Sequence, residues 1–202
     1  VFTEGPDRTF IAGNGIVATI ITDRTHELTG VKWATENLAK DFERVTGKRA
    51  AIDNWTKSPF AKSDVPSLDG PSIAVGTIGI GGIIDKLLSE DELNALKGAR
   101  GKYILKADGN SVIIAGSDKR GTTYGVYALS SSMGVSPWYW WADVPAEKHT
   151  DIYIKNGCYT EGEPKIYYRG IFLNDEAPAL TGWVHDNTHG YTGEFYKRVF
   201  EL

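Results

Sequence analysis

One stretch near the end of this 202-residue chain constrains its fold more than any other. The mostly apolar run Tyr167–Leu173, interrupted by Arg169-Gly170, passes directly into Asn174-Asp175-Glu176. Buried strands of parallel sheets and barrels have this pattern, because both of their faces are covered and their C-terminal ends deliver polar groups to a site. The pattern therefore predicts a buried parallel strand followed by a loop with three polar side chains.

The last residues of the chain predict a short amphipathic helix. Phe195, Val199 and Leu202 have the spacing of one helix face, and no Gly, Asn or Pro follows to end the helix. A helix of about nine residues does not persist alone in water. We therefore expect the chain to be truncated shortly after the start of a second structural unit, with the apolar strand and helix face exposed.

Strands and helices alternate in the first 160 residues. An Asn14-Gly15 hairpin turn comes first, and a polar loop is expected at about 53–71. The expected strands are Ile16–Thr22, Ser72–Gly76, Lys102–Ala107, Ser111–Ala115 and Asp151–Ile154, and the expected helices cover 29–47, 83–88, 90–96 and 119–133. This order predicts an α/β layer domain over residues 1–160, with helices packed on a mixed sheet, and the first βα unit of another domain over residues 161–202.

Composition excludes several classes of partner. The net charge is -4 and no Lys/Arg cluster exceeds three residues, which argues against nucleic acid. No apolar run approaches the length of a membrane span. Cys158 is the only cysteine, so no internal disulfide can form; this suits the cytosol, or a secreted protein stabilised by its core. Asn54-Trp55-Thr56 is the only N-glycosylation sequon, which makes Asn54 a candidate glycan acceptor.

Asn174, Asp175 and Glu176 are the strongest candidate site. Glycosidases use two carboxyl groups that flank the scissile bond. Residues adjacent in sequence rarely span that gap, so Asp175 and Glu176 are not expected to form the catalytic pair. Substrate binding by one or two of the three is the functional interpretation, and bracing of the loop is the structural alternative.

The second candidate is the run of four aromatic residues at 138–141. Flat aromatic faces stack on sugar rings, and they also form interdomain interfaces. Neighbours on an extended chain point to opposite sides, so the four side chains should not all face one core. Trp138, Trp140 and Trp141 are therefore predicted to contact sugar or another domain.

Three weaker motifs predict no ligand. Gly116–Gly121 and Gly76–Gly82 follow strands, where anion-binding loops occur, but neither has nucleotide-binding spacing. His185 and His189 have metal-ligand spacing for a helix, but Asp186–Thr188 favours a loop. We therefore expect tight turns at the glycines, no metal site and no cofactor.

Several of these motifs together resemble the N-terminal part of glycoside hydrolase family 115, the xylan α-1,2-glucuronidases. The matching stretches are Ile114–Tyr127, Gly134–Pro145 and Tyr168–Trp183, with shorter matches at Val75–Gly79 and Gly193–Leu202. The resemblance implies an α/β domain followed by a catalytic (β/α)8 barrel. Residues 161–202 would then be the first βα unit of a truncated barrel, whose remainder is the expected partner of this chain.

The resemblance also implies a function. The parent protein would be a secreted hydrolase that removes glucuronic acid, or its 4-O-methyl form, from glucuronoxylan or aldouronic acids by an inverting mechanism. Asn174 and Asp175 would line the sugar pocket, with Glu176 a weaker candidate. The acid and base would lie on later barrel strands, so this chain alone is expected to be inactive. A non-catalytic carbohydrate-binding module and a scaffolding domain stay open as alternatives.

Overall fold

The computed structural model describes residues 2–55, 68, 70–109 and 111–202. The chain divides into two compact units. The first contains Val1–Ser136 and Pro145–Pro164, and the second contains Pro137–Val144 and Lys165–Leu202. The domain boundary predicted after residue 160 stays a prediction, and most of the polar loop expected at 53–71 lies outside the described residues.

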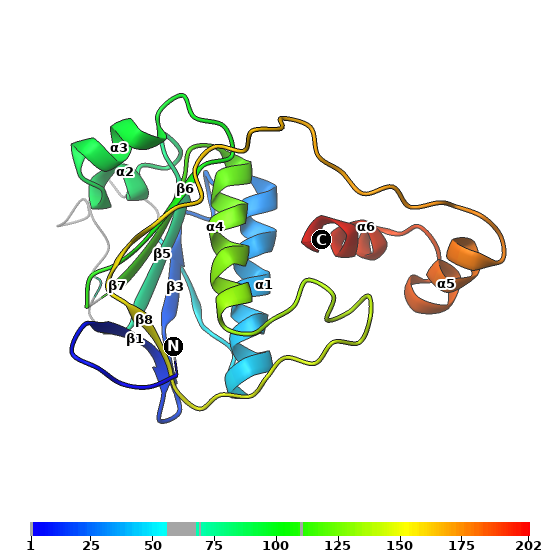
Figure 1. The fold of residues 1–202 in the computed structure, drawn as a ribbon, viewed down its shortest axis with the longest axis horizontal. Coiled ribbons are helices and arrows are strands. Elements are labelled where there is room, and N and C mark those ends of the chain that lie inside the picture. The colour runs from blue at the N-terminus through cyan, green and yellow to red at the C-terminus, as the bar shows by residue number, and fades with distance from the viewer. Residues whose placement is uncertain (1, 56–67, 69, 110) are drawn as a thin grey trace. The chain divides into compact units, whose positions relative to one another are not determined.

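A six-stranded mixed sheet is the centre of the first unit (Figure 1). Its strands in spatial order are β4 (Ile52–Asn54), β3 (Thr19–Thr22), β5 (Ser72–Thr77), β7 (Ser111–Gly116), β6 (Tyr103–Ala107) and β9 (Gly157–Tyr159). The pairs β4–β3, β3–β5 and β5–β7 are parallel, whereas β6 pairs antiparallel with β7 and with β9. Every residue of β5 and β7 is buried, as expected of parallel strands covered on both faces. The predicted α/β layer domain with a mixed sheet is confirmed.

Helices cover both faces of this sheet. The helices α1 (Thr29–Thr46) and α4 (Lys119–Ser132) pack against each other on one face. On the other face, α2 (Ile83–Leu87) and α3 (Glu90–Leu96) contribute Ile83, Ile84 and Leu96 to a core that includes Ile113 of β7. The helix predicted over 29–47 is confirmed, and one face of α1 is buried: Val31, Ala34, Leu38, Phe42 and Val45.

A separate three-stranded antiparallel sheet has the order β2 (Ile16–Val17), β1 (Arg8–Gly13), β8 (Ile152–Lys155). The predicted hairpin is confirmed, but the single strand expected over Ile16–Thr22 is wrong. The chain changes sheets at Ala18: the Ala18 N–H donates to the Ile11 carbonyl (2.7 Å), and the Thr19 N–H donates to the Pro71 carbonyl (3.0 Å). The apolar run Ile16–Thr22 is therefore continuous in sequence, but its two parts hydrogen-bond in different sheets.

A buried carboxyl group joins the end of β5 to the start of α1. Glu27 is 4% exposed. Its oxygens accept hydrogen bonds from the backbone N–H groups of Thr77 (2.8 Å) and Leu28 (2.9 Å) and from the Thr77 hydroxyl (3.1 Å). Burial raises the pKa of Glu27, and these hydrogen bonds offset the rise only in part. The folded protein therefore binds a proton at Glu27 more tightly than the unfolded chain does.

The raised pKa predicts a pH effect on stability. As pH rises through the ordinary glutamate range towards the raised pKa, ionisation of Glu27 lowers the free energy of unfolding. Glu27→Gln should remove this contribution and flatten that part of the pH profile, at a cost of about 1 kcal/mol for the hydrogen bond that an amide NH2 cannot accept. Urea unfolding over a pH series measures both effects, with Glu90→Gln on the exposed start of α3 as the control. Equal slopes for the wild type and Glu27→Gln would contradict the prediction.

The second unit contains two helices, α5 (Ala179–Thr188) and α6 (Gly193–Glu201). The predicted C-terminal helix is confirmed, but the exposure expected for its apolar face is wrong: Phe195 is buried, and Val199 and Leu202 are half-buried. The loop expected at Asp186–Thr188 is wrong, because these residues are helical. Asn187 and Thr188 donate their side-chain hydrogen bonds to carbonyls one turn earlier in the helix, which keeps these loop-favouring residues within it. An overlooked signal was the helical spacing of Leu180, Trp183 and Val184.

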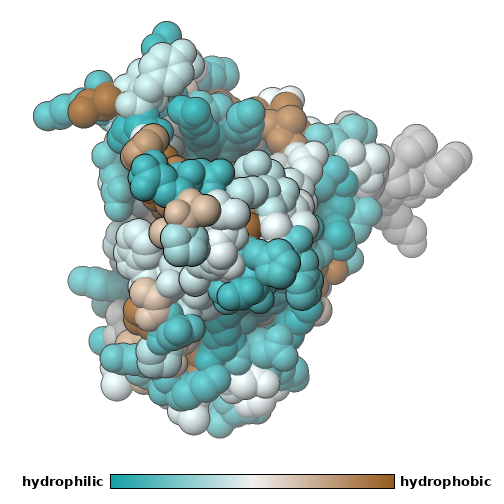
Figure 2. All heavy atoms as spheres, turned by 90° about the vertical axis from the view of Figure 1, so that its right-hand side faces the viewer, coloured by the Kyte–Doolittle hydropathy of each residue, from teal (hydrophilic) through white to brown (hydrophobic). Residues whose placement is uncertain are grey.

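The buried strand expected at Tyr167–Leu173 does not form in this chain. The segment has no strand pairing in the structure, and Phe172 and Tyr168 are 86% and 81% exposed. A strand needs a neighbour to pair its N–H and C=O groups, and none of the described segments pairs with this one. The exposure expected for an apolar segment without its barrel is confirmed for Ile171 and Phe172. On the face drawn in Figure 2, scattered hydrophobic residues interrupt a mostly hydrophilic surface.

Candidate functional site

Asp175 is the best-defined member of the predicted site. It lies in the loop before α5, where its Oδ1 accepts a hydrogen bond from the hydroxyl of Thr181 (2.6 Å), in the first turn of α5. The same oxygen accepts a hydrogen bond from the hydroxyl of Tyr191, which follows the C-terminal end of α5. These two hydrogen bonds lower the pKa of Asp175. The result is an exposed, ionised carboxylate held by two neutral donors.

The other two members of the predicted site differ from Asp175. Asn174 and Glu176 are exposed, and neither has a hydrogen bond to the part of the chain that the structure describes. The structure therefore brings Asp175 together with Thr181 and Tyr191 rather than with its two neighbours. Sequence reasoning missed both hydroxyl partners. Thr181 could have been identified, because it lies in the first turn of the helix that follows the loop of Asp175. Bracing of the loop, the structural alternative, is an observed role of Asp175.

The aromatic run packs inside the second unit. Trp141 stacks on Trp183 of α5 with ring centroids 5.2 Å apart and an interplanar angle of 14°. Trp140 meets Trp141 and Trp183 edge-on, at 5.0 and 5.1 Å. The expectation that neighbours point to opposite sides is wrong here, because the run is a turn closed by the Ala142 N–H and the Trp138 carbonyl (2.9 Å). A turn lets consecutive rings join one cluster.

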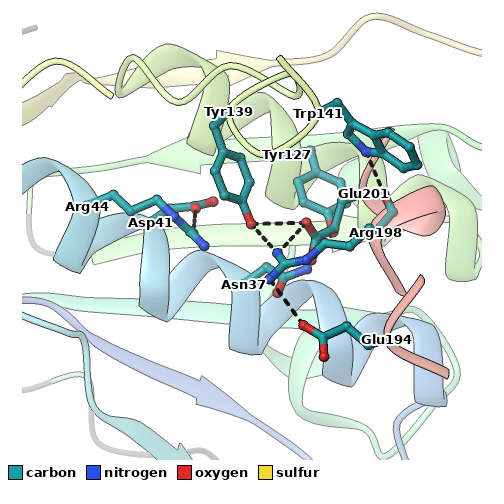
Figure 3. A network of polar contacts seen from close by, with 9 residues as sticks. All are labelled: Asn37, Asp41, Arg44, Tyr127, Tyr139, Trp141, Glu194, Arg198 and Glu201. Atoms are coloured by element: carbon teal, nitrogen blue, oxygen red, sulfur yellow. Dashed lines mark hydrogen bonds and ion pairs between the residues drawn. The ribbon is translucent and has the colours of Figure 1, made fainter. Parts of the chain in front are cut away.

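Arg198 of α6 holds the same loop through polar contacts (Figure 3). Its guanidinium donates to the Tyr139 hydroxyl (2.5 Å) and pairs with Glu201 (3.2 Å), and Tyr139 donates to Glu201 (3.1 Å). The guanidinium carbon also lies 5.1 Å from the Trp140 ring centroid, within cation–π range. The Trp141 indole N–H donates to the Arg198 carbonyl (3.2 Å). Residues 137–144 are thus an integral part of the α5–α6 unit.

These contacts bear on the sugar-stacking hypothesis without deciding it. Trp140 and Trp141 are half-buried, and their rings contact other rings. Trp138 is 49% exposed and is the member of the run with most surface available to a ligand. Sugar contact and an interdomain role for these tryptophans stay predictions.

Carboxylates from the protein occupy the glycine-rich turns of the first unit. Asp118 begins α4, and its two oxygens accept hydrogen bonds from the Gly121 N–H (2.8 Å) and the Gly101 N–H (3.0 Å). In the other turn, Asp85 accepts from the Gly79 N–H (2.9 Å). A second anion at either place would face a fixed negative charge. Both loops are tight turns closed by acidic side chains.

The described residues include neither a helix that could span a membrane nor a cluster of metal ligands. No helix among them combines the length and hydrophobicity needed to cross a bilayer. No group of three His, Cys, Asp or Glu side chains in the described ranges is placed to hold a metal ion. In particular, His185 interacts with its neighbour Asp186 through Nδ1 and Oδ1, 3.3 Å apart.

Comparisons with known proteins agree with the resemblance seen in the motifs. The glycosyl hydrolase family 115 model matches residues 161–202, while no curated protein sequence matches the chain. A solved 4-O-methyl-α-glucuronidase of family GH115, described as specific for decorated arabinogalactans, is 27% identical with a TM-score of 0.76. The alignment covers 96% of this chain and 24% of that one, so the chain spans about a quarter of that enzyme's length.

A weaker likeness extends to hexosaminidases. The GH20 β-N-acetylhexosaminidase of Streptomyces coelicolor A3(2) is 13% identical with a TM-score of 0.47, over 82% of this chain and 25% of the other. A match at this level carries no functional argument. The family 115 model over residues 161–202 and the structural match to a family 115 enzyme both support membership of glycoside hydrolase family 115.

Proposed function

We propose that this chain is the N-terminal portion of an α-glucuronidase that hydrolyses glucuronic acid, or its 4-O-methyl form, from a plant polysaccharide. The observation that carries the proposal is the structural match to a family 115 α-glucuronidase over 96% of the chain. In this proposal residues 161–202 begin the catalytic (β/α)8 barrel. The remainder of the barrel is the essential partner, and residues 1–202 alone have no hydrolytic activity.

The proposed role of this chain in the reaction is to bind the sugar. An inverting glycosidase places its two catalytic carboxyl groups far enough apart to admit a water molecule. We assign neither group to this chain, because the acid and base are expected on later barrel strands. Asn174 and Asp175 would accept or donate hydrogen bonds at the sugar hydroxyls, with Glu176 beside them.

Two polysaccharides are candidates for the substrate. The motif resemblance favours glucuronoxylan, whereas the matched structure belongs to an enzyme described as specific for decorated arabinogalactans. Incubating the complete enzyme with aldouronic acids and, separately, with glucuronosylated arabinogalactan oligosaccharides distinguishes them by the rate of uronic acid release. Proton NMR of the first product tests inversion, since an inverting enzyme acting on an α-linkage releases the β-anomer first.

Asp175→Asn tests the sugar-binding role. The substitution keeps the size of the side chain but removes its charge and part of its capacity to accept hydrogen bonds. In the complete enzyme we expect KM for the glucuronosyl oligosaccharide to rise about tenfold, equivalent to a lost hydrogen bond to a charged group. Asp186→Asn, at an exposed position on α5, is the matched control. Unchanged KM and kcat in Asp175→Asn would remove Asp175 from the sugar site.

We also propose that the parent protein is secreted and can carry a glycan at Asn54. Asn54 is exposed at the end of edge strand β4, where its Oδ1 accepts a hydrogen bond from the Arg24 N–H (2.8 Å). Treating protein secreted from a eukaryotic host with a peptide N-glycosidase would lower its mass if the site is used. If the treatment leaves the mass of the wild-type protein unchanged, Asn54 carries no glycan. Asn54→Gln, which lacks the acceptor, is the control.

The non-catalytic alternatives make different predictions. A carbohydrate-binding module would bind xylan through the Trp138–Trp141 loop in residues 1–202 alone, and Trp138→Ala would weaken that binding. A scaffolding domain would bind no sugar, and the same substitution would affect only stability. Isothermal titration with millimolar xylooligosaccharide separates these two roles.

A further inference from the structure

The hydroxyl groups of Thr181 and Tyr191 contact Asp175 in an arrangement that bracing of the loop alone does not require. Both donate to the same oxygen, Oδ1. No described residue donates a hydrogen bond to Oδ2, and the side chain is exposed. An ionised carboxylate has about four acceptor sites, so this arrangement leaves one oxygen oriented and available to an external donor.

We propose that Thr181 and Tyr191 are positioning residues for Asp175, orienting its carboxylate so that Oδ2 receives a sugar hydroxyl. This inference rests on the proposed sugar-binding function of the site. Thr181 belongs to the first turn of α5, and Tyr191 lies in the bend just beyond the C-terminal end of the same helix, so the two donors flank Asp175 from α5 and from the segment that follows it. The ring of Tyr191 is itself held edge-on by Phe195 of α6, with centroids 5.1 Å apart.

The charge of Asp175 limits which part of the substrate it can contact. Two carboxylates at hydrogen-bonding distance repel, and one of them must then bind a proton or a cation. A carboxylate that stays ionised therefore faces the hydroxyl groups of a uronic acid and not its carboxylate. The hydrogen bonds from Thr181 and Tyr191 lower the pKa of Asp175, which favours the ionised acceptor. The uronate group must be bound by other residues of the enzyme.

The direct test is the pKa of Asp175 in residues 1–202, measured by 13C NMR of the labelled carboxyl groups and assigned with Asp175→Asn. Tyr191→Phe and Thr181→Val should each raise this pKa towards the ordinary aspartate value. Thr181→Ser keeps a hydroxyl and should restore it. Tyr196→Phe is the matched control, because the Tyr196 ring also contacts Phe195 (5.4 Å), while its hydroxyl makes no hydrogen bond to any residue that the structure describes.

The Phe and Val replacements preserve most of the packing, and near-UV circular dichroism of the tryptophan cluster verifies that each variant folds. An unchanged Asp175 pKa in folded Tyr191→Phe and Thr181→Val would overturn the proposal. A raised pKa in both, with no change in Tyr196→Phe and Thr181→Ser, supports it.

The kinetic test is made in the complete enzyme. Tyr191→Phe should raise KM for a glucuronosyl oligosaccharide several-fold with kcat nearly unchanged. The effect should grow as pH falls towards the pKa of Asp175 in this variant, which is expected to be higher than in the wild type. If Asp175→Asn leaves KM unchanged while Tyr191→Phe still raises the Asp175 pKa, the sugar-binding function is wrong. If Asp175→Asn raises KM but Tyr191→Phe changes neither KM nor the pKa, the positioning inference is wrong.

Discussion

Trp141→Ala is expected to remove most of the tertiary order of the second unit, at a cost of about 3 kcal/mol for a large aromatic side chain. The substitution removes the stack on Trp183, the edge contact with Phe195 and the hydrogen bond to the Arg198 carbonyl. The α5–α6 pair has few other sources of burial, since Val184, Thr188 and Phe195 are its only buried residues. Near-UV circular dichroism should lose its tryptophan signal, and urea should unfold this unit earlier.

Two variants calibrate that result. Trp141→Phe keeps an aromatic face for Trp183 but lacks the indole N–H, so an intermediate loss is expected. Trp138→Ala changes the most exposed tryptophan of the same loop and should have a smaller effect on stability. If Trp141→Ala leaves the near-UV spectrum intact and instead abolishes glycan binding, then Trp141 contacts sugar and its packing role is minor.

Gly121→Ala is expected to destabilise the first unit by about 3 kcal/mol or more, because overpacking against backbone cannot be relieved by a side-chain rotation. A Cβ at Gly121 would overlap the backbone carbonyl of Lys102. Further along α4, a Cβ at Gly125 would lie 2.7 Å from Cγ2 of Ile114 on β7. The absence of side chains at these glycines is therefore what lets α4 approach the sheet closely.

Chemical denaturation followed by far-UV circular dichroism measures the effect of Gly121→Ala. Gly182→Ala is the control, since Gly182 is also helical but has no neighbouring atom within 4 Å of a Cβ. Alanine there should stabilise by up to about 1 kcal/mol, the difference in helix propensity. Similar free energies of unfolding for the two variants would show that α4 can move away from the sheet at little cost.

The first unit was largely predictable because the residue pattern within each element indicates whether that element is a helix or a strand. The apolar spacing of α1 and the unbroken apolar runs of β5 and β7 each specify a type of element without reference to distant residues. The error at Ala18 arose where that logic fails, since periodicity cannot show which of two sheets a strand joins. Edge strands β4 and β9 were missed because each has only three residues.

The second unit was less predictable because its order depends on distant pairs. Tyr139 and Glu201 are 62 residues apart, and Trp141 and Arg198 are 57 apart. Asp175 was identified from its place at the end of an apolar run. Its partner Tyr191 lies 16 residues away and depends on the turn at His189, which has a left-handed φ of 53°. No local sequence pattern predicts these contacts.

The second unit is built from two separate segments of the chain, and this affects how the protein folds during synthesis. Chains emerge from the ribosome N-terminus first, at about 5–20 residues per second, and domains tend to fold as they appear. Residues 137–144 emerge before Trp183 and Arg198, so Trp140 and Trp141 cannot contact these two residues until α5 and α6 have been synthesised. The nascent protein therefore passes through a stage that exposes a cluster of tryptophans, the kind of surface that chaperones recognise. A fragment starting at Lys165 would lack those rings permanently, and its two helices should not fold.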